Sequence, residues 1–171
     1  MQTLAEIKSM LAAHGLSPRK QFGQNFLIDH NLIRKLVDAA GVSSGETVLE
    51  IGPGTGTMTE ELLDRGCRVI AAEIDRGLAA MLRERFADRT NFTLVEGDCL
   101  DGMRSLNPAL LDAIGPGPFA LVSNLPYGAG TPVMTILLAK EPRCRGLFVT
   151  IQREVADRLG AGPGSKDYGP L

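Results

Sequence analysis

The sequence has few cysteines, no long apolar run and almost no net charge. Its three cysteines, Cys67, Cys99 and Cys144, match neither a metal-ligand spacing nor an even disulfide framework. No apolar run approaches the length of a transmembrane helix, and no signal peptide is predicted. The formal net charge of -2 gives no overall basic field for a nucleic acid. These absences predict a cytoplasmic protein with reduced thiols, without a metal site and without a membrane segment.

The chain does contain regularly alternating strand and helix patterns. With 171 residues, 44% of them hydrophobic and 22% charged, it is long enough for one soluble domain with a sizeable core. Strands are predicted over 47–51, 67–73, 93–96 and 146–151, and over the run that begins at Phe119 and ends at Asn124. Helical stripes lie between these runs. The alternation predicts an α/β fold, with a parallel sheet and helices on both faces.

Helix boundaries are signalled at several places. Thr3 and Glu6 form a capping box, and Asp29 can cap a second helix that ends at Gly41. Thr131 followed by proline predicts the cap of a later helix. The segment 17–27 fits neither the hydrophobic period of a helix nor that of a strand, and it is interpreted as an ordered loop. From 100 to 117 the pattern weakens and indicates only a short helix.

A glycine-rich loop follows the first predicted strand. Gly52, Gly54 and Gly56 lie between that strand and a helix, and glycines let backbone N–H groups approach a ligand closely. The spacing is not G-x-G-x-x-G, and the lysine of a P-loop is absent, so a diphosphate cradle is disfavoured. A cofactor with an amino-acid moiety fits better, with Glu50 accepting from its ammonium group. The alternative is a tight turn without a ligand.

Two further predicted strands end near acidic residues. Glu73 closes the second strand, where an acid typically accepts hydrogen bonds from ribose hydroxyls and repels a phosphorylated ribose. Asp75 is placed to cap the next helix. Asp98 follows the third strand and can accept from the exocyclic amine of an adenine ring. The alternatives are a solvated strand end at Glu73 and a structural Gly-Asp turn at Asp98.

The fourth strand ends in the tetrapeptide Asn124-Leu125-Pro126-Tyr127. The Asn124 side-chain oxygen and a main-chain carbonyl at Leu125 or Pro126 can accept both N–H groups of an aromatic amine and free its lone pair. Tyr127 offers a face for a splayed-out base. Positioning then serves as the main catalytic device, because a sulfonium methyl needs no strong general base. The alternative is a strand-ending turn with a partly buried tyrosine.

These motifs together resemble the ribosomal RNA adenine dimethyltransferases. The resemblance rests on Gln24-Asn25-Phe26-Leu27, the run from Glu50 to Gly56, Glu73-Ile74-Asp75, Gly97-Asp98 and the run from Asn124 to Tyr127. The closing run 152–169 is more similar to the bacterial KsgA branch than to the Erm branch. The resemblance implies a Rossmann-like class I methyltransferase fold. It also implies an N-terminal helix and arm over residues 1–28, covering the cofactor, and a methyltransferase domain over 29–171.

The resemblance further implies S-adenosylmethionine as cofactor and small-subunit (16S) ribosomal RNA in the assembling 30S particle as partner. Two adjacent adenosines would each be dimethylated at N6. The matching cofactor positions are Asn25, Leu27, Gly52, Glu73, Asp98 and Asn124, and the matching catalytic positions are Asn124, Pro126 and Tyr127. Members of the family continue with further strands and a helical domain. We therefore expect this chain to keep most cofactor contacts but to methylate weakly or not at all.

Three alternatives stay open at this stage. The first is an Erm-type methyltransferase of large-subunit ribosomal RNA. The second is a non-catalytic ribosome-assembly or RNA-binding factor on the same fold. The third is a nicotinamide-dependent oxidoreductase, which the strand, glycine loop and distant acid suggest. The third lacks the dinucleotide glycine spacing and leaves the tetrapeptide unexplained.

Overall fold

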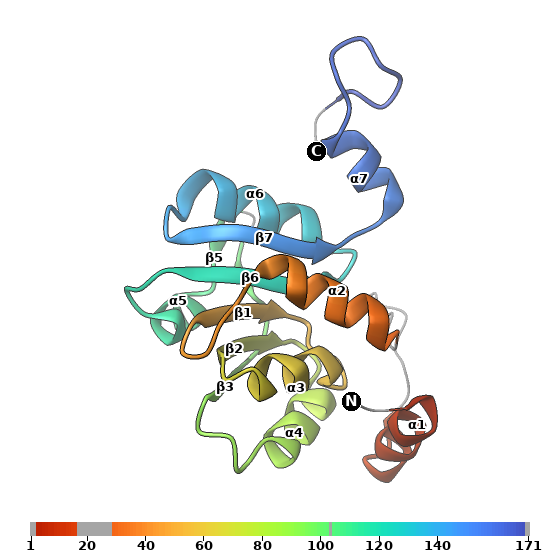
Figure 1. Ribbon diagram of the computed structural model, residues 1–171, viewed down its shortest axis with the longest axis vertical. Helices are drawn as coiled ribbons and strands as arrows, with labels where there is room; N and C mark the ends of the chain where they lie inside the picture. The colour runs from red at the N-terminus through yellow and green to blue at the C-terminus, as the bar shows by residue number, and fades with distance from the viewer. Residues whose placement is uncertain (1–2, 17–28, 103, 170–171) are drawn as a thin grey trace.

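The computed structural model describes residues 3–16, 29–102 and 104–169. One sheet of five parallel strands runs in the order β3-β2-β1-β6-β7 (Figure 1). The strands are β1 (Thr47–Ile51), β2 (Arg68–Glu73), β3 (Phe92–Glu96), β6 (Phe119–Asn124) and β7 (Cys144–Thr150). The predicted α/β class is confirmed, and strand bounds agree with those read from the sequence to within two residues.

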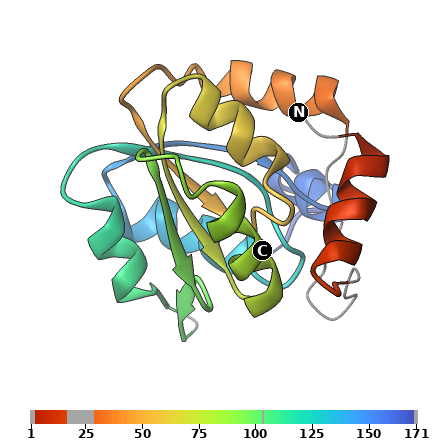
Figure 2. The same ribbon diagram turned by 90° about the horizontal axis from the view of Figure 1, so that it is seen from below.

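Helices cover both faces of this sheet (Figures 1 and 2). They are α1 (Leu4–Ala13), α2 (His30–Ala40), α3 (Thr57–Asp64), α4 (Arg76–Arg85), α5 (Pro108–Ile114) and α6 (Gly130–Lys140). The helix α7 (Arg153–Leu159) has no buried residues and extends beyond the β7 edge of the sheet (Figure 1). Successive strand side chains alternate between two buried clusters. Val48 and Val69 pack with α1 to α4, whereas Leu49 and Ile70 pack with α5 and α6. The result is a three-layer domain with a core on each side of the sheet.

The first two helices form where their caps predict. Thr3 and Glu6 make the reciprocal capping box of α1, and the Asp29 side chain accepts from two backbone N–H groups at the start of α2. Ile7 and Leu11 bury α1 against the core. His14 Nε2 lies 3.3 Å from a carboxylate oxygen of Glu84 on α4. This face of α1 is therefore held against α4.

Two local features differ from the sequence-based expectation. An antiparallel hairpin, β4 (Leu100–Asp101) with β5 (Ser105–Leu106), precedes α5, and strands of two residues carry no readable period. The prediction that Thr131 caps a helix is wrong, because α6 begins at Gly130. The Pro126 carbonyl already accepts from the N–H groups of Ala129 and Gly130, so the chain enters the helix earlier.

Asn25, Leu27 and the rest of the segment 17–28 lie outside the described residues. An arm over 1–28 that covers the cofactor, and a domain boundary at residue 29, stay predictions.

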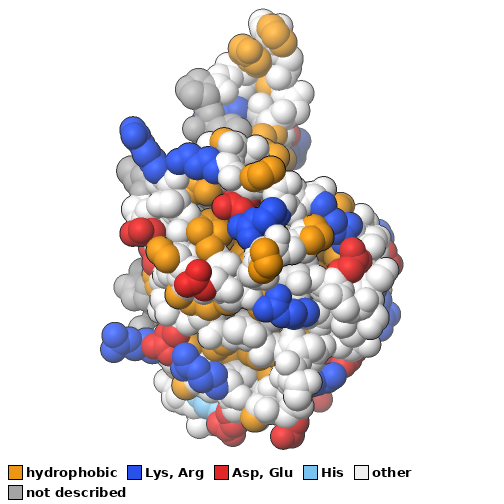
Figure 3. All heavy atoms as spheres, turned by 90° about the vertical axis from the view of Figure 1, so that its left-hand side faces the viewer, with side chains coloured by type: hydrophobic (Ala, Val, Ile, Leu, Met, Phe, Trp, Pro, Cys, Tyr) orange, Lys and Arg blue, Asp and Glu red, His pale blue; other side chains and the backbone are white. Residues whose placement is uncertain are grey.

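Within the described ranges, no helix is both long enough and apolar enough to cross a membrane. On the side of the molecule where the strands begin, acidic and basic side chains are interspersed (Figure 3).

The strand order reverses between β1 and β6. The paired register of these strands runs from Thr47↔Phe119 to Leu49↔Leu121. Beyond it, the buried Ser123 hydroxyl donates to the Ile51 carbonyl at 2.7 Å and accepts from the Ile51 N–H at 3.3 Å. At the carboxyl end of the two central strands, the Ser123 side chain thus replaces the backbone–backbone hydrogen bonds of the sheet. Ligands of open α/β sheets bind at such a reversal point.

We expect Ser123→Ala to lower the free energy of unfolding by roughly 1–3 kcal/mol, because it removes the hydroxyl partner of two buried backbone groups. Urea denaturation measures this change. The matched control is Ser105→Ala, whose exposed hydroxyl donates to the Asp101 carbonyl at 2.8 Å. The control should change stability by less than about 0.5 kcal/mol. Equal effects in the two variants would show that the buried hydrogen bonds of Ser123 add no more to the free energy of unfolding than an exposed one does.

Candidate active site

The loops that follow β1 and β6 touch each other directly. Gly52 has a φ of +66°, and a Cβ at this position would lie 2.8 Å from Cγ of Pro126. Both the backbone conformation and the close approach therefore require glycine. The predicted cofactor loop and the predicted catalytic turn form one packed unit, in which a side chain at Gly52 would push the two loops apart.

The far end of the glycine loop is held by α4. Gly56 has a φ of +79°, and a Cβ there would lie 2.8 Å from the Phe86 ring and 2.9 Å from Leu82. Arg85 donates to the Thr55 carbonyl. Arg85 also pairs with Glu60 on α3 at 2.9 Å. No sequence signal pointed to Arg85, because its partners Thr55 and Glu60 lie far from it in the chain.

Glu50 is a buried carboxyl at the end of β1. Only 2% of its surface is exposed, and its Oε2 accepts from the Thr59 hydroxyl at 2.7 Å. Burial raises the pKa of Glu50 from its ordinary value of 4.5 to about 8, and the nearby Glu73 carboxylate adds to the rise. Burial thus favours the protonated form of Glu50, and a nearby cation would favour its ionised form.

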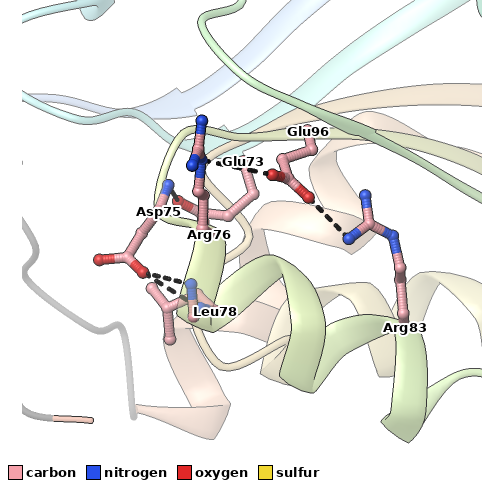
Figure 4. Close-up of polar contacts among 7 residues, drawn as sticks. Glu73, Asp75, Arg76, Leu78, Arg83 and Glu96 are labelled. Atoms are coloured by element: carbon pink, nitrogen blue, oxygen red, sulfur yellow. Dashed lines mark hydrogen bonds and ion pairs between the residues drawn. The ribbon is translucent and has the colours of Figure 1, made fainter.

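Glu73 ties the end of β2 to the glycine loop. Its surface is 4% exposed, and one of its oxygens accepts from the Gly54 N–H at 3.3 Å. The other oxygen accepts from the Asp75 N–H at 2.9 Å (Figure 4). Burial raises its pKa. Glu96 is its register partner on β3, and it instead forms an ion pair with Arg83 at 2.7 Å (Figure 4). Two glutamates at neighbouring strand ends thus have different environments.

Asp98 and Ile74 both lie at the carboxyl end of the strands, after β3 and β2. Asp98 is exposed, and its Oδ1 accepts from the Leu100 N–H at 3.0 Å, so the residue makes a local turn. This bond uses one of the acceptor sites of the carboxylate. Ile74, between Glu73 and Asp75, is 48% exposed and offers an apolar surface. The sequence reading passed over Ile74, although an exposed β-branched residue directly after a buried strand end could have signalled it.

The tetrapeptide turn is held by β7. The Thr150 hydroxyl donates to Oδ1 of Asn124 at 2.5 Å, and the Thr150 carbonyl accepts from the Leu125 N–H at 3.1 Å. Of the two main-chain carbonyls that the sequence left open as a second acceptor, that of Pro126 already accepts from Ala129 and Gly130. The arrangement therefore favours the Leu125 carbonyl.

Tyr127 is 52% exposed, so its ring is accessible beside the turn. An open and mainly apolar pocket adjoins it, between the turn, the start of α6 and the start of α7. The lining residues are Leu125, Pro126, Tyr127, Gly130, Thr131, Met134, Ile151, Gln152 and Val155. A planar aromatic group could lie against this surface.

The structure brings most of the predicted site residues to one end of the sheet: Glu50, Gly52, Gly54, Gly56, Glu73, Asp98, Asn124, Pro126 and Tyr127. A diphosphate would lie near two buried carboxyls here, whereas a cationic cofactor would be stabilised by them. Among the described residues, no group of three or more His, Cys, Asp or Glu could hold a metal ion.

We expect Glu50→Gln to flatten the pH dependence of stability. Between pH 4.5 and about 8 the unfolded chain releases the Glu50 proton while the folded chain retains it, so this group lowers stability as pH rises. Over this pH range, the free energy of unfolding of the wild-type chain should fall by roughly 2–4 kcal/mol more than that of the variant. Urea denaturation at several pH values measures this difference. Stability curves that run parallel for the two proteins would contradict the raised pKa of Glu50. Glutamine can keep the bond to Thr59.

The chain matches the family model of ribosomal RNA adenine dimethylase over residues 15–171. It is 43% identical to ribosomal RNA small subunit methyltransferase A of Geobacillus thermodenitrificans (strain NG80-2), over 99% of this chain and 57% of that protein. It is 46% identical to the protein of the same name from Moorella thermoacetica (strain ATCC 39073 / JCM 9320), over 95% of this chain and 58% of that protein. The chain thus spans just over half the length of these curated relatives.

Two solved structures share the fold. The 23S rRNA methyltransferase ErmE aligns with a TM-score of 0.66 and 34% identity, over 78% of this chain and 50% of that one. A dimethyladenosine transferase from Plasmodium falciparum aligns with a TM-score of 0.64 and 27% identity, over 84% of this chain and 49% of that one. The expected Rossmann-like class I methyltransferase fold is confirmed, and the chain belongs to the ribosomal RNA adenine dimethylase family.

Proposed function

We propose that this chain forms the cofactor-binding and catalytic part of an enzyme that dimethylates N6 of two adjacent adenosines in small-subunit ribosomal RNA. The observation that carries the proposal is the direct packing of the Asn124–Tyr127 turn on the glycine loop through Gly52 and Pro126. This packing supports the proposal, because it would bring an amine-binding turn beside a cofactor loop. The names of the curated relatives support the small subunit as the source of the RNA. The proposed setting is the assembling 30S particle in the cytoplasm.

S-adenosylmethionine fits the residues present. Its ammonium and sulfonium groups are cationic and suit a site with two buried carboxyls, Glu50 and Glu73. The backbone of the glycine loop would lie along the methionine moiety, Glu73 would accept from the ribose hydroxyls, and Asp98 would accept from the adenine amine. Ile74 would cover one face of that adenine. When bound, the cofactor supplies an electrophilic methyl group, and its sulfur takes the electron pair of the broken S–C bond.

Asn124 and Leu125 would prepare the methyl acceptor. The amine of adenine is a poor nucleophile, because its lone pair is delocalised into the ring. Oδ1 of Asn124 and the carbonyl of Leu125 would accept its two N–H groups and hold the nitrogen with its lone pair toward the methyl group. As the N–C bond forms, the nitrogen becomes cationic and releases one proton to solvent. Tyr127 would stack on the extruded base.

A second candidate is methylation of large-subunit ribosomal RNA, which the likeness to ErmE favours. The two candidates differ in substrate. Methyl transfer should be measured on free 23S RNA and on undermethylated small subunits, with the protein at its natural length. Transfer to the small subunit alone supports the proposal, and transfer to free 23S RNA alone overturns it. Binding of RNA without any methyl transfer would favour a non-catalytic assembly factor.

We expect the chain to bind S-adenosylmethionine saturably, and Glu73→Gln to weaken the binding by roughly tenfold or more through a lost charge-assisted bond. Isothermal titration calorimetry measures the dissociation constant. Glu96→Gln is the matched control, because it changes the same residue type at the neighbouring strand end. The control should bind within about twofold of the wild type. An unchanged affinity in Glu73→Gln would remove this residue from the cofactor site.

We expect Tyr127→Ala to reduce methyl transfer by roughly 10- to 100-fold, since base stacking on an aromatic side chain contributes ~1–3 kcal/mol. Tyr127→Phe keeps the ring and should retain most of the activity. Initial rates of methyl incorporation into undermethylated small subunits measure both variants. Equal losses in the two variants would mean that the hydroxyl, and not the ring face, is the functional group.

A further inference from the structure

We propose that Thr150 is a positioning residue, whose hydroxyl holds the Asn124 side-chain amide in place for the methyl acceptor. The inference rests on the proposed function, in which Oδ1 of Asn124 accepts a hydrogen bond from the substrate amine. Thr150 lies at the end of β7, far from Asn124 in the chain but directly opposite it in the paired register of β6 and β7.

Thr150 contacts Asn124 and the residue after it. Its hydroxyl lies 2.5 Å from Oδ1 of Asn124, at the short end of the range for O–H···O bonds. Its carbonyl accepts from the N–H of Leu125 at 3.1 Å. One residue of β7 therefore holds the side chain of Asn124 and the main chain at the start of the turn.

The orientation of the amide decides whether the site can work. An asparagine amide presents an oxygen on one side and an NH₂ group on the other, and the two have nearly the same shape. If the amide turned over, an N–H group would face the N–H groups of the substrate amine and repel them. The Thr150 hydroxyl donates to Oδ1 in the orientation that presents the oxygen, and this bond holds the amide group in place at the end of β7. An amide oxygen can accept two hydrogen bonds, so the bond from Thr150 is compatible with a second one from the substrate.

The experiment compares Thr150→Val, which removes the hydroxyl but keeps the β-branch, with Thr150→Ser, which keeps the hydroxyl. Thr93→Val is the control, because Thr93 is an exposed threonine on β3 at the other edge of the sheet. Three quantities are measured. They are the NMR signals of the Asn124 side-chain amide (identified by their loss in Asn124→Asp), the calorimetric affinity for S-adenosylmethionine, and kcat and KM for undermethylated small subunits with the protein at its natural length.

We expect Thr150→Val to shift the Asn124 amide signals and to lower kcat by roughly tenfold, with KM and cofactor affinity within about twofold. Thr150→Ser should restore kcat, and Thr93→Val should match the wild type. Wild-type kcat in Thr150→Val would overturn the proposal, and so would equal losses in the valine and serine variants. A parallel fall in cofactor affinity would also overturn it, since it would show a general structural effect.

The two proposals can fail separately. If the wild-type protein binds the cofactor but transfers no methyl group to ribosomal RNA, the proposed function is wrong. In that case the NMR signals still test the contact. Unchanged Asn124 amide signals in Thr150→Val would show that the hydroxyl does not hold the amide in place.

Discussion

The strand order of the sheet reverses between β1 and β6, and both loops of the candidate site begin at this reversal. At that point the loops after the two strands leave the sheet side by side, and Gly52 and Pro126 come into contact. Ser123 bridges to Ile51 where the ladder of the two strands stops. Because the same geometry supports both loops, a change at either one would alter the distance between the cofactor and the group to be methylated.

The electrostatics of the site follow from burial. Glu50 and Glu73 lie at the ends of adjacent strands, and removing them from water raises the pKa of each. A buried acid costs stability unless it gains a partner. The Thr59 hydroxyl donates a hydrogen bond to Glu50, and two backbone N–H groups donate to Glu73. A cationic cofactor would give these carboxyls a further partner of opposite charge. The site is thus matched to a cationic organic ligand, and it disfavours the diphosphate of a nicotinamide cofactor.

Support for the reactive turn comes from the neighbouring strand β7. Thr150 holds the side chain of Asn124 and the main chain of Leu125, while the Pro126 carbonyl accepts from the first residues around α6. The acceptor groups are therefore fixed before a substrate arrives. Such preorganisation is the main device available to an enzyme that aligns a weak nucleophile with a reactive methyl group.

The α/β class and the strand bounds, to within two residues, could be predicted from the amino-acid sequence, and so could the end of the sheet where the candidate site residues gather. These predictions are possible because periodicity, caps and glycine loops are local, and because all carboxyl ends of parallel strands meet at one edge. The close approach of Gly52 to Pro126, the bond from Arg85 to the glycine loop and the bond from Thr150 to Asn124 became known only from the three-dimensional packing. It also placed the start of α6 at Gly130. These features depend on register and packing between segments far apart in the chain, which no local pattern records.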